Sequence, residues 1–257
     1  MSNTAQKMIP DHSQSGMKTY EYVFQYFLDQ ILSGRMKIND RIPPEREIAE
    51  KLGVSRNSIR EVMHMLEING LIECLQGSGN YVRCNPQDYM ARSSQMIMSL
   101  MGIDYTEIFH IRAGLELVAL RLAIEEADEE EVEEIHEALV NMDRSETGEE
   151  SARWDQEFHK RLIKASHNRL LILYTSMVRD FSDRFITDLR GRISLRSGER
   201  EELNRAHWGI YDALLHRDYM SGSAAMNRHF EIVGDELFHK QEKMSENSKS
   251  KIKKQIP

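Results

Sequence analysis

The stretch from residue 43 to residue 82 constrains the fold most, because it combines two short helical patterns, a tight turn and two extended runs around glycines. Pro44 suits the first turn of a helix, Gly53 the left-handed position after its end, and Ser55 the N-cap of the next helix. The second helix carries an apolar stripe at the i, i+3, i+4, i+7 spacing, formed by Ile59, Val62, Met63 and Leu66. These signals predict a helix-turn-helix.

The segments on either side complete a small domain. After Asn69-Gly70, two extended runs flank Gln76-Gly77-Ser78-Gly79, whose glycines permit positive φ, and this order predicts a β-hairpin wing. Upstream, apolar residues at helical spacing from residue 20 to residue 33 predict a supporting helix that stops at Gly34. Residues 19–84 are therefore expected to form a winged helix-turn-helix of three helices and a small wing, and residues 1–18 a disordered tail.

Polar residues at the start of the second helix indicate contact with DNA. In a helix-turn-helix, this end of the recognition helix enters the major groove. Arg56 and Arg60 lie one turn apart and can reach a guanine edge or a phosphate, while Asn57 can donate and accept at an adenine. An ordinary solvated helix face is the alternative interpretation of the two arginines.

The charge distribution bears on how DNA would be bound. The net charge is −8, but basic and acidic residues balance between residues 18 and 84, and much of the acidic surplus lies in 125–137 and 146–150. A neutral DNA-binding domain should bind modestly and with strong salt dependence unless two copies act together, which favours a dimer. The sequence has no signal-peptide order and no run of membrane-spanning length, so we expect a cytoplasmic protein.

With these motifs in place, residues 19–84 resemble the DNA-binding domain of GntR-family bacterial transcription regulators, above all in Pro-Glu-Arg-Glu-Ile-Ala-Glu-Lys-Leu-Gly-Val-Ser-Arg. The resemblance implies DNA contacts from the Arg of the Glu-Arg pair, from the first residues of the recognition helix and from the wing tip. Residue by residue, these are Arg46, Ser55, Arg56, Asn57, Ser58, Arg60, Gln76 and Gly77. Pro44, Asn57-Ser58 and Ser78 depart from common family residues, which leaves the operator sequence open.

The rest of the chain is predicted to be all-helical. Residues 85–95 are the expected linker, residues 96–240 an all-α bundle of six or seven helices, and residues 241–257 a disordered Lys-rich tail. The expected helices cover residues 96–101, 105–126, 129–143, 151–166, 169–189, 200–216 and 219–240. The fold class is therefore mainly α, with one small β-hairpin.

Two pairs of residues in the bundle carry side chains that can ligate a metal ion. Asp155 and His159 are four apart and share a helical face, although such a pair also arises by chance. His207 and His229 each lie about ten residues, roughly 15 Å of helix, from the break near residue 218. If the two helices are antiparallel, these imidazoles face each other.

Residues 96–240 resemble the FCD effector domain of the FadR subfamily of GntR regulators. The resemblance implies a divalent metal ion, Zn or alternatively Ni or Mn, held by Asp155, His159, His207 and His229. It also implies a small carboxylate effector, such as a hydroxy acid or a sugar acid. Arg112 matches a family arginine that often points into the pocket, although it can equally pair with Glu116 one turn away; Asn204 is a second candidate.

These expectations combine into a dimeric repressor that binds a palindromic operator and is released by an effector at the metal centre. We do not expect an enzyme, because no general base accompanies the histidines and the aspartate. Two alternatives stay open. One is a metal-dependent hydrolase-like enzyme, since the same residues can activate water; the other is a DNA-binding protein without ligand control.

Overall fold

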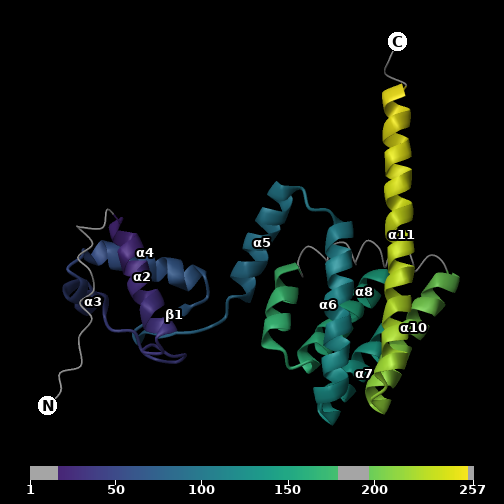
Figure 1. Ribbon diagram of the computed structural model, residues 1–257, viewed down its shortest axis with the longest axis horizontal. Coiled ribbons are helices and arrows are strands. Elements are labelled where there is room, and N and C mark those ends of the chain that lie inside the picture. The colour runs from purple at the N-terminus through teal and green to yellow at the C-terminus, as the bar shows by residue number, and fades with distance from the viewer. Residues whose placement is uncertain (1–16, 179–196, 254–257) are drawn as a thin grey trace. The chain divides into compact units, whose positions relative to one another are not determined.

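The computed structural model describes residues 17–178 and 197–253, which divide into two compact units with the boundary between Met90 and Ala91. The expected disordered tail 1–18 falls almost wholly outside the described residues. The first unit holds α2 (Thr19–Leu32), α3 (Glu45–Leu52), α4 (Arg56–Ile68), β1 (Ile72–Leu75) and β2 (Gly79–Val82). The second holds the helices from α6 onward (Figure 1).

The first unit is the predicted winged helix-turn-helix. Gly53 ends α3 with a left-handed φ of 67°, and the Ser55 hydroxyl accepts a hydrogen bond from the Ser58 amide at the start of α4. Helices α2 and α3 both pack on α4, so that the stripe from Ile59 to Leu66 becomes the centre of a small core. The burial of this stripe leaves the other face of α4 to solvent.

The wing is a two-stranded antiparallel hairpin, as predicted. Strands β1 and β2 pair in the register Ile72 with Val82 through Leu75 with Gly79. The turn between them contains Gly77, whose φ of 78° is easy only for glycine. At the base of the wing, Gly70 has a φ of 68°, and a Cβ at this position would overlap the carbonyl group of Asn85. The sequence after the wing therefore packs directly on the glycine that ends α4.

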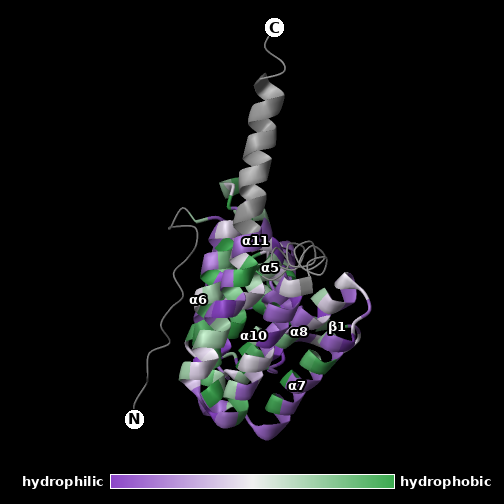
Figure 2. Ribbon diagram, turned by 90° about the vertical axis from the view of Figure 1, so that its right-hand side faces the viewer, coloured by the Kyte–Doolittle hydropathy of each residue, from purple (hydrophilic) through white to green (hydrophobic). Residues whose placement is uncertain are grey.

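The second unit is a helical bundle. It contains α6 (Tyr105–Glu126), α7 (Glu129–Arg144), α8 (Gly148–Ala165), α10 (Ser197–His216) and α11 (Tyr219–Lys253). Residues 169–178 are also helical, while the rest of the expected helix 169–189 lies outside the described residues. Purple and green residues alternate along α7, as expected for a helix with one face toward a core (Figure 2). That core is centred on Leu120, Ile135, Phe158 and Ile210.

Two expectations about the helices were wrong. α5 runs from Gln87 to Met101, so most of the expected linker 85–95 is helical; Pro86 precedes the helix, and its carbonyl oxygen accepts from the Met90 amide. α11 continues to Lys253, although a disordered tail was expected from residue 241. Between residues 241 and 253 there is no Pro or Gly, and Lys, Glu and Gln are good helix formers, so the helix has no stop signal there.

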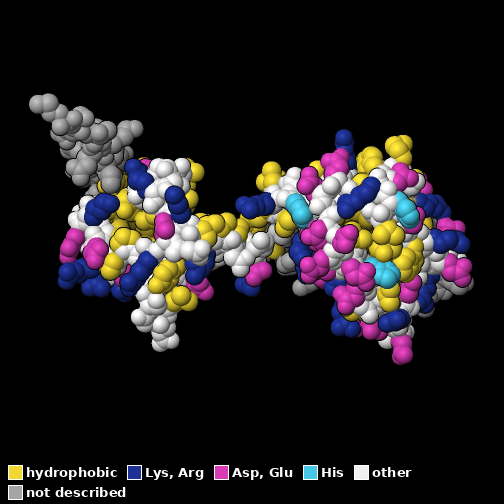
Figure 3. Space-filling model, turned by 90° about the horizontal axis from the view of Figure 1, so that it is seen from below, with side chains coloured by type: hydrophobic (Ala, Val, Ile, Leu, Met, Phe, Trp, Pro, Cys, Tyr) yellow, Lys and Arg dark blue, Asp and Glu magenta, His cyan; other side chains and the backbone are white. Residues whose placement is uncertain are grey.

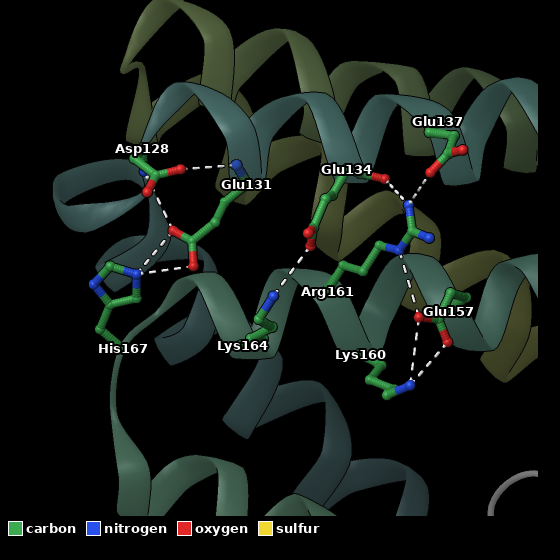
Figure 4. Close-up of polar contacts among 9 residues, drawn as sticks. All are labelled: Asp128, Glu131, Glu134, Glu137, Glu157, Lys160, Arg161, Lys164 and His167. Carbon is green, nitrogen blue, oxygen red and sulfur yellow. Dashed lines mark hydrogen bonds and ion pairs between the residues drawn. The ribbon is translucent and has the colours of Figure 1, made fainter.

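Ion pairs link α8 to α7 (Figure 4). Arg161 lies beside Glu157 of its own helix and Glu137 of α7, with Nη1 at 3.0 Å from the Glu137 carboxylate, and Lys164 reaches Glu134 at 3.2 Å. The pair between His167 and Glu131 extends the series to the end of α8 at 2.8 Å. Because most of these groups are exposed, each pair contributes no more than about 1 kcal/mol, and the buried apolar contacts hold α8 in place.

Candidate DNA-binding surface and metal centre

The start of α4 presents the predicted DNA-contacting side chains to solvent. Arg56 and Asn57 are exposed, and Ser55 and Ser58 lie next to them with their hydroxyl oxygens 2.9 Å apart. Arg60, one turn along, binds both carboxylate oxygens of Glu45, at 3.0 and 3.4 Å. This pairing raises the pKa of Arg60 above its usual value, so the guanidinium stays a cation.

The remaining predicted contacts lie on α3 and the wing. Arg46 is exposed on α3 and forms a loose pair with Glu50, 3.4 Å away, so little holds it in one rotamer. Gln76 and Gly77 are exposed in the turn of the wing. A further cation lies here that was not predicted from the sequence: the guanidinium of Arg41 lies against Gly79, next to the turn. Figure 3 shows several Lys and Arg side chains on the visible face of this unit.

The four predicted metal-ligating residues come together inside the second unit. Asp155 and His159 come from α8, His207 from α10 and His229 from α11, and one ligand atom from each lies within 4.8 Å of the others. Tetrahedral or octahedral ligands about 2 Å from a common ion are separated by comparable distances. The two antiparallel helices α10 and α11 bring His207 and His229 level, with ring centroids 4.6 Å apart. The expected convergence is therefore present.

Burial makes this cluster unusual, since each of its four residues is at most 4% exposed. The cluster is surrounded by apolar rings, with Phe158 edge-on to His159 and His207, and Phe230 edge-on to His229. Both ring nitrogens of His229 are buried without a hydrogen-bond partner among the described residues. Such an arrangement costs free energy unless the nitrogens find a partner, and a cation among the four residues would provide one.

The protonation of the cluster also suits a cation. Burial lowers the pKa of His229 well below its usual value, and the neighbouring His207 and His159 lower it further, against a smaller opposite effect of Asp155. His229 is therefore a neutral imidazole at neutral pH, which is the form that ligates a metal. His207 donates from Nδ1 to the Leu203 carbonyl oxygen at 2.9 Å, and its Nε2 lies 3.1 Å from Asp155 Oδ1. The residues present fit a divalent metal ion.

The two predicted effector-binding residues lie in different surroundings. Arg112 on α6 pairs through Nε with Glu116, which confirms the alternative that its spacing suggested, and its guanidinium lies 6.0 Å from the centre of the Phe230 ring. Asn204 on α10 donates to Asp143 of α7 at 3.0 Å, beside a bond from Trp208 to the same carboxylate. Arg112 is thus linked to the histidine cluster by their common contact with Glu116, whereas Asn204 is hydrogen-bonded to α7.

Sequence reasoning named Glu116 only as a possible partner of Arg112 and did not predict that it contacts the histidine cluster. It is fully buried in α6, and its carboxylate contacts both Arg112 and His159 Nδ1. Burial alone raises the pKa of this carboxyl, but its interactions with Arg112 and His159 outweigh that effect and lower the pKa to about 2. The available signal was a carboxylate between Leu115 and Leu117 on an apolar helix, a position that requires a buried partner.

Comparisons with known proteins agree with both units. A family model described as bacterial regulatory proteins of the gntR family matches residues 19–82, and the FCD domain matches residues 107–232. The Uxu operon transcriptional regulator of Escherichia coli (strain K12) is 30% identical and covers 87% of this chain and 88% of its own length. HTH-type transcriptional regulator LutR of Bacillus subtilis is 29% identical over 80% of this chain and 95% of its own.

Two further similarities bear on fold and activity. The Glc operon transcriptional activator of Escherichia coli (strain K12) is 27% identical over 73% of this chain and 76% of its own. The solved structure named Streptococcus agalactiae GntR covers 83% of this chain and 98% of its own at 19% identity, with a TM-score of 0.56, and supports the fold alone. Among the described residues, no helix is long and apolar enough to cross a membrane.

The matched families and relatives are transcription regulators rather than enzymes, which removes the hydrolase-like alternative. GntR regulators bind DNA operators and commonly act as dimers. The sequence similarity to the Uxu operon regulator extends over most of both chains. Each of the two family matches lies within one of the two structural units. The chain belongs to the GntR family of bacterial transcription regulators and carries an FCD effector domain.

Proposed function

We propose that this regulator is a cytoplasmic repressor that binds a palindromic operator as a homodimer and releases it when a small carboxylic acid binds at a metal centre. In this proposal, Ser55, Arg56, Asn57, Ser58 and Arg60 lie in the major groove, and Arg46, Gln76 and Gly77 contact the adjoining DNA. The support is geometric, because the exposed end of α4 carries short polar side chains between two arginines. Such an end can approach base edges without steric obstruction.

Dimerisation follows from the weak net charge of the DNA-binding unit. Basic and acidic residues balance in the DNA-binding unit of one copy, and Glu45 already pairs with Arg60 in the free protein. Two copies on two half-sites double the number of phosphate contacts and sum their binding free energies. A palindrome is the operator symmetry that matches a two-fold protein dimer.

The second part of the proposal is carried by a single observation, the buried convergence of Asp155, His159, His207 and His229. Three imidazoles and one carboxylate favour Zn²⁺, with Ni²⁺ or Mn²⁺ as alternatives. A cation held there supplies a positive charge and coordination positions that an organic carboxylate can occupy. Hydroxy acids and sugar acids are the proposed class, since a neighbouring hydroxyl allows them to chelate.

Arg112 is the proposed partner for the acid. Its side chain is 16% exposed, and it shares Glu116 with the ligand His159, which brings its guanidinium to the edge of the cluster. A guanidinium can bind a carboxylate through two parallel N–H groups. Asn204 remains a second candidate, which would have to exchange its bond to Asp143 for the effector.

DNA recognition is tested with the full-length protein and its Arg56→Ala variant. Binding sites are selected from random DNA, and affinities for the enriched sequence are then measured by fluorescence anisotropy at several salt concentrations. We expect a two-fold symmetric sequence and at least a tenfold loss for Arg56→Ala, because a bidentate arginine–guanine contact is worth about 1–3 kcal/mol. If the variant keeps its full affinity, α4 does not read the operator as proposed.

Effector control is tested by thermal unfolding of the metal-loaded protein with a panel of hydroxy acids and sugar acids, repeated after chelation. Stabilisation that disappears with the chelator supports a metal-bound effector. Addition of the same acid to the protein–operator complex then determines the sign. Release of DNA supports repression, whereas tighter binding would favour an activator, as one of the relatives is named.

A further inference from the structure

Glu116 is the most completely buried carboxylate beside the histidine cluster. It is 0% exposed on α6, and each of its oxygens contacts a different partner: Oε1 contacts Arg112 Nε, and Oε2 contacts His159 Nδ1. An ionised carboxylate without partners at such a depth would cost several kcal/mol. The two partners therefore account for its burial, and they also give it a defined orientation.

The contact has a chemical consequence for His159. A carboxylate only accepts hydrogen bonds, so the ring nitrogen that faces it, Nδ1, carries the hydrogen. When the ring is neutral, the other nitrogen, Nε2, presents its lone pair on the side of Asp155, whose Oδ1 lies 3.9 Å away. In His207, Nδ1 donates a hydrogen bond to the Leu203 carbonyl oxygen and so carries the hydrogen as well. In the neutral form of each ring, the Nε2 lone pair therefore faces the centre of the cluster.

We propose that Glu116 is a positioning residue of the metal centre, which fixes the tautomer and the ring orientation of His159 and is itself held in place by Arg112. Acceptors on the far side of ligating histidines raise ligand basicity, and their loss typically weakens metal binding by about 10–100-fold. This inference rests on the proposed metal centre. It adds that Arg112, which is proposed to bind the effector, and the metal ligand His159 contact the same carboxylate. A movement of Arg112 on effector binding is therefore transmitted to His159 through Glu116.

Glu116→Gln separates this role from a merely structural ion pair. A glutamine has the same shape but only one acceptor oxygen for two donors. The charged Arg112 is the stronger donor and keeps that oxygen, so the amide NH₂ turns toward His159. His159 must then accept at Nδ1, and its hydrogen moves to Nε2, where it blocks the metal. A residue that only filled space or balanced charge would not change the tautomer.

The experiment uses the full-length protein in four forms: wild type, Glu116→Gln, Glu116→Ala, and Glu157→Gln as the control. Glu157 is on the same helix as His159 and pairs with Lys160 and Arg161. Zn²⁺ affinity is measured by competition with a chromophoric chelator at pH 8. In the metal-free proteins, the tautomer of His159 is read from two-bond ¹H–¹⁵N correlations of the imidazole ring.

We expect the wild type to show His159 with hydrogen on Nδ1, and Glu116→Gln to show it on Nε2 with Zn²⁺ bound about 10–100-fold more weakly. Glu116→Ala should lose affinity to a similar extent, and Glu157→Gln should match the wild type. A wild-type His159 with hydrogen on Nε2, or equal Zn²⁺ affinity in wild type and Glu116→Gln, overturns the inference alone. A wild type that binds no Zn²⁺ overturns the metal centre itself.

Discussion

Replacing His229 by leucine should have opposite effects on stability with and without metal. In the metal-free protein, the His229 ring is 3% exposed and neither nitrogen has a hydrogen-bond partner among the described residues. A buried polar group without a partner costs about 1–3 kcal/mol, and an apolar side chain of similar volume removes this cost. For a unit of this size, a gain of about 1–2 kcal/mol raises the melting temperature by roughly 2–8 °C.

With metal, the order should reverse. A ligand at 100 times its Kd stabilises the folded state by about 2.7 kcal/mol, and the wild type gains this whereas His229→Leu has lost one of four ligands. Unfolding can be followed by tryptophan fluorescence, because the only two tryptophans, Trp154 and Trp208, both lie in the second unit. His136→Leu is a matched control, since His136 stacks on Tyr211 outside the cluster. Its response to metal should equal that of the wild type.

The same variant has a defined pH signature. The pKa of His229 is lowered in the folded state by burial and by His207, so as pH falls the unfolded chain takes up the proton first. Metal-free wild type should therefore lose stability as pH drops below about 6.5, the ordinary histidine value, and His229→Leu should lose less. If metal-free His229→Leu is less stable than the wild type by more than about 1 kcal/mol, the imidazole has a structural partner and the reasoning is wrong.

Two further outcomes are expected in the first unit. Gly70→Ala should destabilise this unit by more than about 1 kcal/mol, because the φ of Gly70 is 68° and the added Cβ would meet the Asn85 carbonyl. Hydrogen exchange of the α4 amides should then accelerate, and unchanged exchange would contradict the packing described. Arg41→Ala should weaken binding to all DNA sequences alike and reduce the slope of log affinity against log salt concentration by about 1. The reason is that Arg41 lies beside the wing, where it can contact a phosphate, and a phosphate contact carries no base preference. A change in the preferred DNA sequence would instead indicate a base contact.

Helix bounds illustrate why local signals were sufficient in some places and not in others. The residues Asp-Glu-Glu-Glu at 128–131 have the sequence pattern of a capping box, and the structure shows Asp128 and Glu131 bonded reciprocally at the start of α7. Caps and turn glycines act within a few residues, so their meaning does not depend on the rest of the fold. At Pro86 and after residue 240, the composition alone did not distinguish a polar helix from a linker or a tail.

The cluster of Asp155, His159, His207 and His229 lies between these cases. The i, i+4 spacing of Asp155 and His159 placed two ligands on one face, and the break near residue 218 placed His207 and His229 at matching heights. The packing of α8, α10 and α11 around Phe158 then made one buried site from three helices. Glu116 shows the limit of such reasoning, because its contact with His159 joins positions 43 residues apart on α6 and α8.

The sequence by itself therefore determined the winged helix-turn-helix and the helical class of the second unit, because short-range periodicity and capping encode them. The four clustered residues were identified from their spacing together with the resemblance to the FCD domain. Three features became known only from the tertiary structure. The four clustered residues are buried, Glu116 contacts both His159 and Arg112, and Asn204 donates a hydrogen bond to Asp143. Burial and contacts between distant helices depend on how apolar faces pack together, which residue spacing along one helix does not specify.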